Sequence, residues 1–344
     1  MEKRDIKDIP IEELKKDLSG MGQASYRAVQ IFRYIYQEGI VNFAQAVNLP
    51  KILRERLDES YCISNLRVIE HLKSADDCEK FLFKLSDGNL IETVLISAKA
   101  RQTICLSTQV GCKFHCVFCA SGQAPFKRNL FPQEMLGQIL FVLHRLKRKV
   151  TNYVFMGMGE PLDNIEHLLT TLKIMNCRAG LNIGARRITV STCGLIPGMK
   201  RLKDSGLAVN LSVSIHAAQD KLRASLMPVN RQYPLTALMR ACAEFSRETK
   251  RIITLEYILF KGVNDSMEDA DNLAQLSRKL RAKVNLIGYN SVSGEKFFPA
   301  EQQTANRFMY QLLRQGIQVT LRESRGKGIQ AACGQLAGGA SFRH

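Results

Sequence analysis

Three closely spaced cysteines are the part of this sequence best suited to chemistry. They follow the pattern C-x3-C-x2-C, directly after a strand-like stretch at residues 103–110, and they are Cys112, Cys116 and Cys119. Iron–sulfur clusters in proteins are held by cysteine thiolates, normally four of them. Three thiolates on one short loop can hold three corners of a cubic cluster and leave the fourth iron free for a small-molecule ligand. The spacing therefore favours a cluster that does chemistry.

Two other interpretations of this loop are open from the residues alone. The cysteines could simply be reduced and partly buried, with no metal. A structural zinc site would typically show paired C-x2-C hooks some distance apart. Cys116 and Cys119 form one such hook, and no second is evident in the sequence.

Small polar residues recur farther along the chain at the ends of predicted strands. They are Gly159, Glu160, Ser191, Ser214, His216 and Asn290. Glycines let the backbone approach a ligand closely, and a glutamate can accept hydrogen bonds from an ammonium group. A glycine turn or a capping serine would explain each residue singly. Together they predict a pocket for a zwitterionic ligand that carries a nucleoside.

Two further cysteines stand out by their context. Cys105 lies on the predicted strand before the cysteine loop, and Cys333 lies in a tail of small residues at 330–336. A buried core thiol and a cysteine in a flexible tail explain them equally well. The remaining five cysteines are interpreted as structural: Cys62, Cys78, Cys177, Cys193 and Cys242.

Alternating strands and helices must position these residues. Strands are predicted at 103–108, 153–156, 187–191, 209–214, 252–259 and 284–289, with helices near 132–148, 163–176, 196–204, 235–249 and 266–281. A further helix and strand follow at 301–315 and 317–322. Repeated strand–helix units imply a parallel sheet with helices outside. We expect an α/β fold in which residues 103–322 form a partial (βα)6 barrel, with its site at the C-terminal strand ends.

The segments before and after the predicted barrel show other sequence patterns. Residues 1–75 have apolar residues at helical spacing and predict a small helical domain. Residues 76–102 predict a β-hairpin, because Asp87 and Gly88 lie between alternating runs. Residues 323–344 form the C-terminal loop that carries Cys333.

Composition narrows the class of protein. The 344 residues are 45% hydrophobic and 24% charged, which suits one large domain and a small one. No apolar run reaches the roughly 18 residues of a membrane span, and the charged N-terminus lacks a signal-peptide core. We therefore expect a cytoplasmic protein that makes no use of a membrane and keeps its ten cysteines reduced.

Net charge points to a polyanionic partner. The formal charge is +17, and basic residues cluster at 127–128, 145–149, 178–187, 200–203 and 322–327. A surplus of this size favours nucleic acid, although a generally basic surface would also produce it. The chain has no tryptophan and few aromatic clusters, so no base-stacking platform is evident.

The sequence resembles the radical S-adenosylmethionine (SAM) superfamily and, within it, the RNA adenine methyltransferases that act on 23S rRNA and tRNA. The related antibiotic-resistance methylases share the resemblance. The matching segments are 107–119, 156–162, 214–217, 227–230, 262–265, 284–287 and 331–336. They span the predicted barrel and the tail, whereas the N-terminal region matches only loosely.

The resemblance implies a reaction with two SAM molecules per turnover and one 4Fe-4S cluster on Cys112, Cys116 and Cys119. One SAM would methylate Cys333. The second would be cleaved to a 5′-deoxyadenosyl radical, which takes hydrogen from that methyl group. The carbon radical would add to carbon 2 of the target adenine. Cys105 would then attack Cys333, forming a disulfide and releasing the product.

The resemblance also assigns contacts and partners. SAM contacts are implied for Gly159, Glu160, Ser191, Ser214, Ile215, His216 and Asn290. Glu92 matches the family's proton acceptor, the alternative being a glutamate on the wet face of the hairpin. The implied partners are RNA and an electron donor of the flavodoxin or ferredoxin type, and we expect a monomer.

Alternatives to this function are a carbon-8 methylase of the resistance type, another radical SAM enzyme, and a non-enzymatic basic RNA-binding protein. Pro161 after Glu160 resembles the carbon-2 enzymes. No second cysteine set, as in methylthiotransferases, is evident. Residues 325–330 lack the acidic residues usual before the tail motif, which leaves the anchoring of the tail open.

Overall fold

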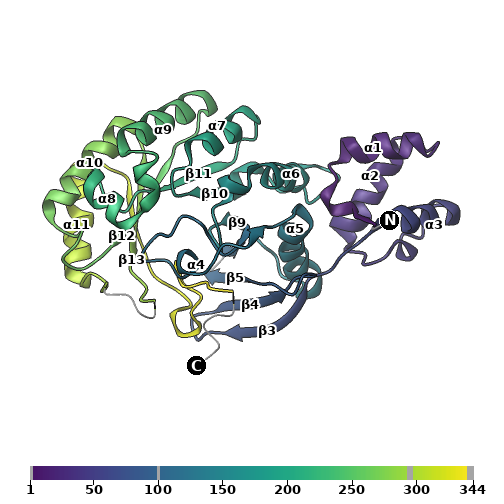
Figure 1. The fold of residues 1–344 in the computed structure, drawn as a ribbon, viewed down its shortest axis with the longest axis horizontal. Helices are drawn as coiled ribbons and strands as arrows, with labels where there is room; N and C mark the ends of the chain where they lie inside the picture. Colours follow the sequence, from purple (N-terminus) through teal and green to yellow (C-terminus); the bar gives the residue numbers. More distant parts are fainter. Residues whose placement is uncertain (1–2, 99–100, 293–296, 339–344) are drawn as a thin grey trace.

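The computed structural model describes residues 3–98, 101–292 and 297–338. The end of the predicted C-terminal loop, 339–344, lies outside the described residues, as do residues 1–2 of the predicted helical domain and 99–100 of the predicted hairpin. One ten-stranded sheet forms the centre, in the order β14-β13-β12-β11-β10-β9-β6-β5-β4-β3 (Figure 1). In the described part, no helix is both long and apolar enough to cross a bilayer.

Seven strands run parallel, each paired with the next along the chain. They are β6 (Arg101–Cys105), β9 (Asn152–Phe155), β10 (Ile188–Thr192), β11 (Asn210–Ser214), β12 (Thr254–Leu259), β13 (Lys283–Gly288) and β14 (Val319–Arg322). The edges β14 and β3 leave the sheet open. The predicted partial barrel of strand–helix units is confirmed, and β14 is the additional strand predicted at 317–322.

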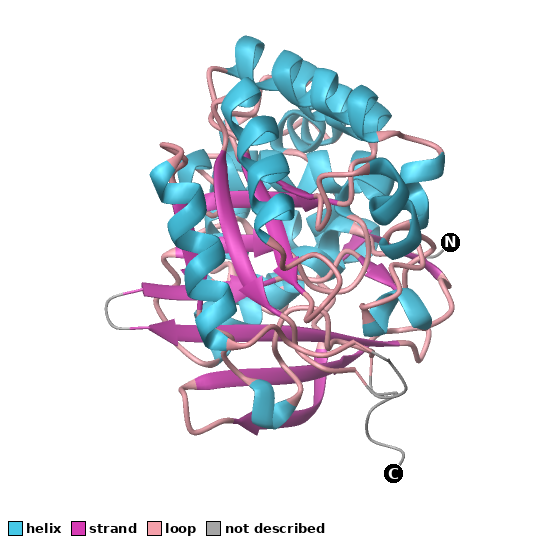
Figure 2. Cartoon of the chain, turned by 90° about the vertical axis from the view of Figure 1, so that its left-hand side faces the viewer, coloured by secondary structure: helices cyan, strands magenta, loops and turns pink. Residues whose placement is uncertain are grey.

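Helices surround the parallel strands on the outside (Figure 2). They are α5 (Pro132–Leu140), α6 (Ile165–Asn176), α7 (Ile196–Asp204), α8 (Asp220–Leu226), α9 (Leu235–Thr249), α10 (Met267–Leu280) and α11 (Gln302–Arg314). Alternate strand residues such as Val190, Val213 and Leu255 are buried in the main hydrophobic core. The other face of the same strands carries Ser214 and Glu256. This alternation follows from the two-residue period of a strand, and it leaves the inside of the barrel polar.

The N-terminal part is helical, with α1 (Ile11–Gly20), α2 (Tyr26–Arg33) and α3 (Lys51–Ser60). Three antiparallel strands follow, β3 (Arg67–Lys73), β4 (Cys78–Lys84) and β5 (Leu90–Ala98). The β4–β5 hairpin turns at Gly88, whose φ of +82° suits glycine. The prediction that helix extends through residues 1–75 is wrong at its end, because β3 lies inside that range. This edge strand mixes charged and apolar residues on both faces, so it carries no alternating signal.

Short elements complete the fold. β1 (Arg4–Asp5) pairs with β2 (Tyr61–Cys62), and β7 (Gln109–Val110) pairs with β8 (Arg128–Asn129). A one-turn helix, α4 (Ala120–Gln123), begins directly after the cysteine loop. The loop therefore lies between β7 and α4, at the C-terminal side of β6.

Candidate cofactor and substrate site

Two adjoining cavities lie at the C-terminal ends of the parallel strands. The cysteine-loop cavity has a volume of about 160 Å³ and contains all three clustered cysteines on its wall. The tail cavity has a volume of about 420 Å³ and is lined by much of the C-terminal segment 321–336. Both cavities share Cys119, Met156, Gly157, Ile287, Arg322, Cys333 and Gly334. A ligand in one cavity would therefore lie next to a ligand in the other.

The cysteine loop presents three free thiols to its cavity, as predicted. Gly111 has φ +76°, and a Cβ there would lie 2.1 Å from the Pro125 carbonyl oxygen, so the loop requires glycine. Burial raises the pKa of all three thiols, that of Cys112 to about 12. Such thiols stay neutral unless a metal stabilises the thiolates.

The donor set fits an iron–sulfur cluster. Among the described residues, no three His, Cys, Asp or Glu side chains converge closely enough to hold one metal ion. A cubic cluster instead spreads its ligating sulfurs over separate corners, so three thiols around one cavity wall suit it. Two buried oxygens have no hydrogen-bond partner in the described structure, Glu256 Oε2 at the cysteine-loop cavity and Asn290 Oδ1 at the tail cavity. Polar atoms left this way indicate a missing ligand.

Five of the six predicted strand-end residues form part of the wall of the cysteine-loop cavity: Gly159, Glu160, Ser191, Ser214 and His216. The sixth, Asn290, lines the tail cavity instead. Gly159 has φ +93°, and a Cβ there would meet Gln109 Cβ at 2.4 Å. The Glu160 carboxylate accepts hydrogen bonds from the Leu162 N–H (3.0 Å) and the Cys193 N–H (2.7 Å). Burial raises the pKa of Glu160, and these N–H donors oppose that rise.

His216 is a neutral hydrogen-bond donor. Its Nδ1 accepts a hydrogen bond from the Ile258 N–H at 3.0 Å, which leaves the proton of the neutral ring on Nε2. Burial lowers the pKa of His216 to about 3. Ile215, also predicted as a SAM contact, lines neither cavity: its side chain lies in the core and its N–H donates to the Glu256 carbonyl oxygen.

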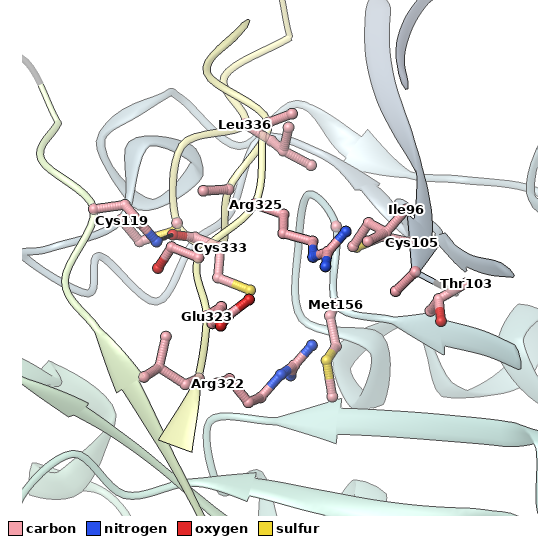
Figure 3. Close-up of a pocket in the computed structure, with 18 of the residues that line it drawn as sticks. Ile96, Thr103, Cys105, Cys119, Met156, Arg322, Glu323, Arg325, Cys333 and Leu336 are labelled. Atoms are coloured by element: carbon pink, nitrogen blue, oxygen red, sulfur yellow. Dashed lines mark hydrogen bonds between the residues drawn. The ribbon is translucent and has the colours of Figure 1, made fainter. Parts of the chain in front are cut away.

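The tail places Cys333 where the two cavities meet. Cys333 is exposed and lines both cavities, and Asn290 Nδ2 donates to its carbonyl oxygen at 3.2 Å. Cys105, a free thiol on β6, lines the tail cavity with it (Figure 3). Burial raises the pKa of Cys105 to about 12, and the positive charge of Arg322 opposes that rise. The structure thus brings the two predicted partner cysteines to one cavity.

Glu92 lies beneath the tail instead of on a wet face. Its side chain is fully buried and pairs with Lys80 Nζ at 2.9 Å. Its Oε2 accepts hydrogen bonds from the N–H groups of Ala337 (2.7 Å) and Gly338 (3.0 Å). Glu92 lines neither cavity, so in this structure it anchors the tail.

Sequence reasoning missed Glu256 and Arg322 as site residues. Glu256 lies inside β12, where it is the single charge in an apolar strand, and it lines the cysteine-loop cavity. An isolated charge in a buried strand was the signal that could have found it. Arg322 was noticed only as part of a basic cluster, yet it lines both cavities.

The matches to known proteins cover nearly the whole chain. Residues 106–274 match the model of the radical SAM superfamily, and residues 4–63 match that of the ribosomal RNA large subunit methyltransferase N-terminal domain. The chain is 43% identical over 338 residues to the dual-specificity RNA methyltransferase RlmN of Geotalea uraniireducens, with 98% of each chain covered. It is 45% identical over 334 residues to RlmN of Geobacter sulfurreducens, covering 97% of this chain and 92% of that protein.

A solved structure shows the same likeness. The crystal structure of a radical SAM methyltransferase from Sphaerobacter thermophilus matches with a TM-score of 0.91 and 42% sequence identity. The match covers 97% of this chain and 99% of that one. The helical N-terminal part, the barrel and the tail therefore all fall within the range of one solved relative.

Proposed function

This chain belongs to the dual-specificity RNA methyltransferase family of the radical SAM superfamily, and we propose that it methylates carbon 2 of an adenosine in 23S rRNA and in tRNA. The observation that carries this proposal is the position of Cys333 on the wall shared by both cavities. From there one thiol can meet a cofactor in the cysteine-loop cavity and a base in the tail cavity.

The family implies a 4Fe-4S cluster and SAM. We propose that Cys112, Cys116 and Cys119 hold one cluster per chain, and that two SAM molecules are used per turnover. When bound, the cluster would supply the electron that cleaves SAM and yields a 5′-deoxyadenosyl radical. Glu160 and His216 would orient SAM, the first as an acceptor for its ammonium group and the second as an Nε2–H donor.

Two cysteines would carry the methyl transfer. The Cys333 sulfur loses its proton and bonds the methyl group of the first SAM as the sulfonium C–S bond breaks. After the carried carbon has joined adenine C2, Cys105 attacks the Cys333 sulfur. The S–S bond forms as the C–S bond to the product breaks, and the released CH2 carbon takes a proton to become the methyl group. The shared tail cavity supports this pairing, and an external reductant must restore both thiols before the next turnover.

Glu92 is proposed to accept the proton that leaves adenine C2. Its burial beside the tail supports a role near Cys333, but both carboxylate oxygens are engaged, one by Lys80 and the other by the N–H groups of Ala337 and Gly338. Residues 337–338 must therefore leave the carboxylate before the proton can arrive.

The remaining assignments complete the proposal. A net charge of +17 supports a nucleic-acid substrate. An enzyme that acts on ribosomal and transfer RNA works in the cytoplasm, and we propose a monomer reduced by a flavodoxin or ferredoxin. Pro161 after Glu160 favours carbon 2 over carbon 8.

The test is mass spectrometry of nucleosides from RNA treated with anaerobically reconstituted protein. The proposal expects 2-methyladenosine from the wild type and none from Cys333→Ala, although the variant keeps its cluster absorbance. Formation of 8-methyladenosine, or full activity of Cys333→Ala, would contradict it.

A further inference from the structure

One oxygen of a buried carboxylate in the barrel interior lacks a hydrogen-bond donor. Glu256 is 4% exposed, and its Oε2 has no partner in the described structure. Its Oε1 accepts a hydrogen bond from Asn285 Nδ2 at 3.1 Å, which fixes the orientation of the carboxylate. Leaving a buried carboxylate oxygen without a donor is costly, more so than for a neutral group. The arrangement therefore indicates a donor that binds from the cavity.

In the part of the chain that the structure describes, the side-chain donors beside this carboxylate are the neutral groups of Ser212 and Asn285, and neither is charged. Within the described residues, no ion pair closer than 4.0 Å joins Glu256 to a basic side chain; Arg322, which lines the same cavity, acts on it only at longer range. Burial raises the pKa of Glu256, whereas Arg322, Ser212 and Asn285 oppose that rise. Donors on a ligand would satisfy the free oxygen.

Glu256 and Glu160 lie on different parts of the cavity wall. Glu160 follows β9, and Glu256 lies on β12, three strands along the sheet. Strands are spaced by about 4.8 Å, so the two carboxylates can meet opposite ends of an elongated ligand. The Glu160 charge acts on the Cys112 and Cys116 thiols, which places Glu160 at the cysteine-loop end.

We propose that Glu256 binds the ribose hydroxyl groups of SAM. This inference rests on the proposed function, which puts the amino-acid end of SAM at the cysteine loop and Glu160. The nucleoside end then extends toward β11 and β12, where Ser214 and Glu256 are register partners. Two neighbouring hydroxyl groups are donors that an ionised carboxylate, which only accepts, can bind together.

The test is anaerobic calorimetry of reconstituted protein with SAM and its 2′-deoxy and 3′-deoxy analogues. The wild type should bind at least one deoxy analogue about tenfold or more weakly than SAM, as expected for a hydrogen bond to a charged group. Glu256→Met, which keeps the shape but removes the acceptor, should bind SAM about as weakly as the analogue and lose the discrimination. Glu256→Gln is the milder change, and its SAM affinity and its discrimination should lie between those of the wild type and Glu256→Met.

A matched control separates this contact from general weakening of SAM binding. Glu160→Gln should weaken SAM but keep the discrimination against the deoxy analogues. The inference would be overturned if Glu256→Met still bound the deoxy analogues more weakly than SAM, by the same factor as the wild type. It would also be overturned if Glu256→Met lost discrimination only against a further SAM analogue, one that lacks the adenine amino group. If the wild type binds SAM but makes no methylated adenosine, the proposed function fails while the ribose contact stands. If it does not bind SAM, both fail.

Discussion

Lys80 and Glu92 form an ion pair of 2.9 Å whose side chains are 1% and 0% exposed. The pair joins neighbouring strands β4 and β5. The other carboxylate oxygen of Glu92 accepts hydrogen bonds from the backbone N–H groups of Ala337 and Gly338. Lys80 also donates to the carbonyl oxygen of Gln330 at 3.3 Å. One buried charge pair thus holds the tail on both sides of Cys333.

Removing one partner of this pair should be strongly destabilising. Lys80→Met leaves the Glu92 charge buried and unpaired, which costs about 3–5 kcal/mol of unfolding free energy. The double variant Lys80→Met/Glu92→Leu should recover part of that loss because no charge is left behind. Urea denaturation measures the unfolding free energies of the single and the double variant. A Lys80→Met variant as stable as the wild type would contradict the buried ion pair.

Loss of the Glu92 acceptor should loosen the end of the tail. In Glu92→Ala the N–H groups of Ala337 and Gly338 lose their acceptor, so we expect faster hydrogen–deuterium exchange there. Asp76→Ala is the matched control, because Asp76 accepts from the Gly326 N–H at the other end of the tail. It should speed exchange at 326 and leave 337–338 protected; equal exchange in both variants would argue against separate anchors.

His216 should make the protein less stable in acid. Its folded pKa is about 3 against an ordinary value of 6.5, so below pH 6.5 the unfolded chain binds a proton that the folded chain excludes. The stability contribution is complete above pH 6.5 and declines as pH falls toward 3. Between pH 7.5 and pH 5 the wild type should lose ~2 kcal/mol relative to His216→Asn. If the wild type and His216→Asn lost the same unfolding free energy between the two pH values, a buried neutral ring at His216 would be contradicted.

The three loop cysteines should be required for iron, and other cysteines should not. Alanine at Cys112, Cys116 or Cys119 should abolish the brown absorbance and lower the iron content of anaerobically reconstituted protein. Cys62→Ala and Cys177→Ala are matched controls, since both lie away from the two cavities. A loop variant with the wild-type iron content would remove that residue from the cluster.

Local patterns in the sequence predicted much of the site. The three cysteines are close in sequence, and parallel strands in chain order bring Gly159, Ser191 and Ser214 to one edge without further information. The burial of Glu92 could not be predicted, because the tail that covers it lies 245 residues away. Without that contact a charge on a hairpin is best explained as solvent-exposed.

Two other differences have similar causes. Ile215 follows a strand end like its neighbours, but the period of the strand turns its side chain into the core. The charges of Arg67 and Lys73 masked the edge strand β3, which pairing with β4 stabilises.

The central claim is that Cys333 carries the new carbon to the base and Cys105 releases it. The most direct measurement is intact-mass analysis of Cys105→Ala after reaction with RNA and SAM. We expect a covalent protein–RNA adduct that maps to Cys333, because Cys119, which also lines the tail cavity, is engaged by the cluster and no free thiol is left there to break the C–S bond. Free, fully methylated RNA from this variant, with no adduct, would contradict the account.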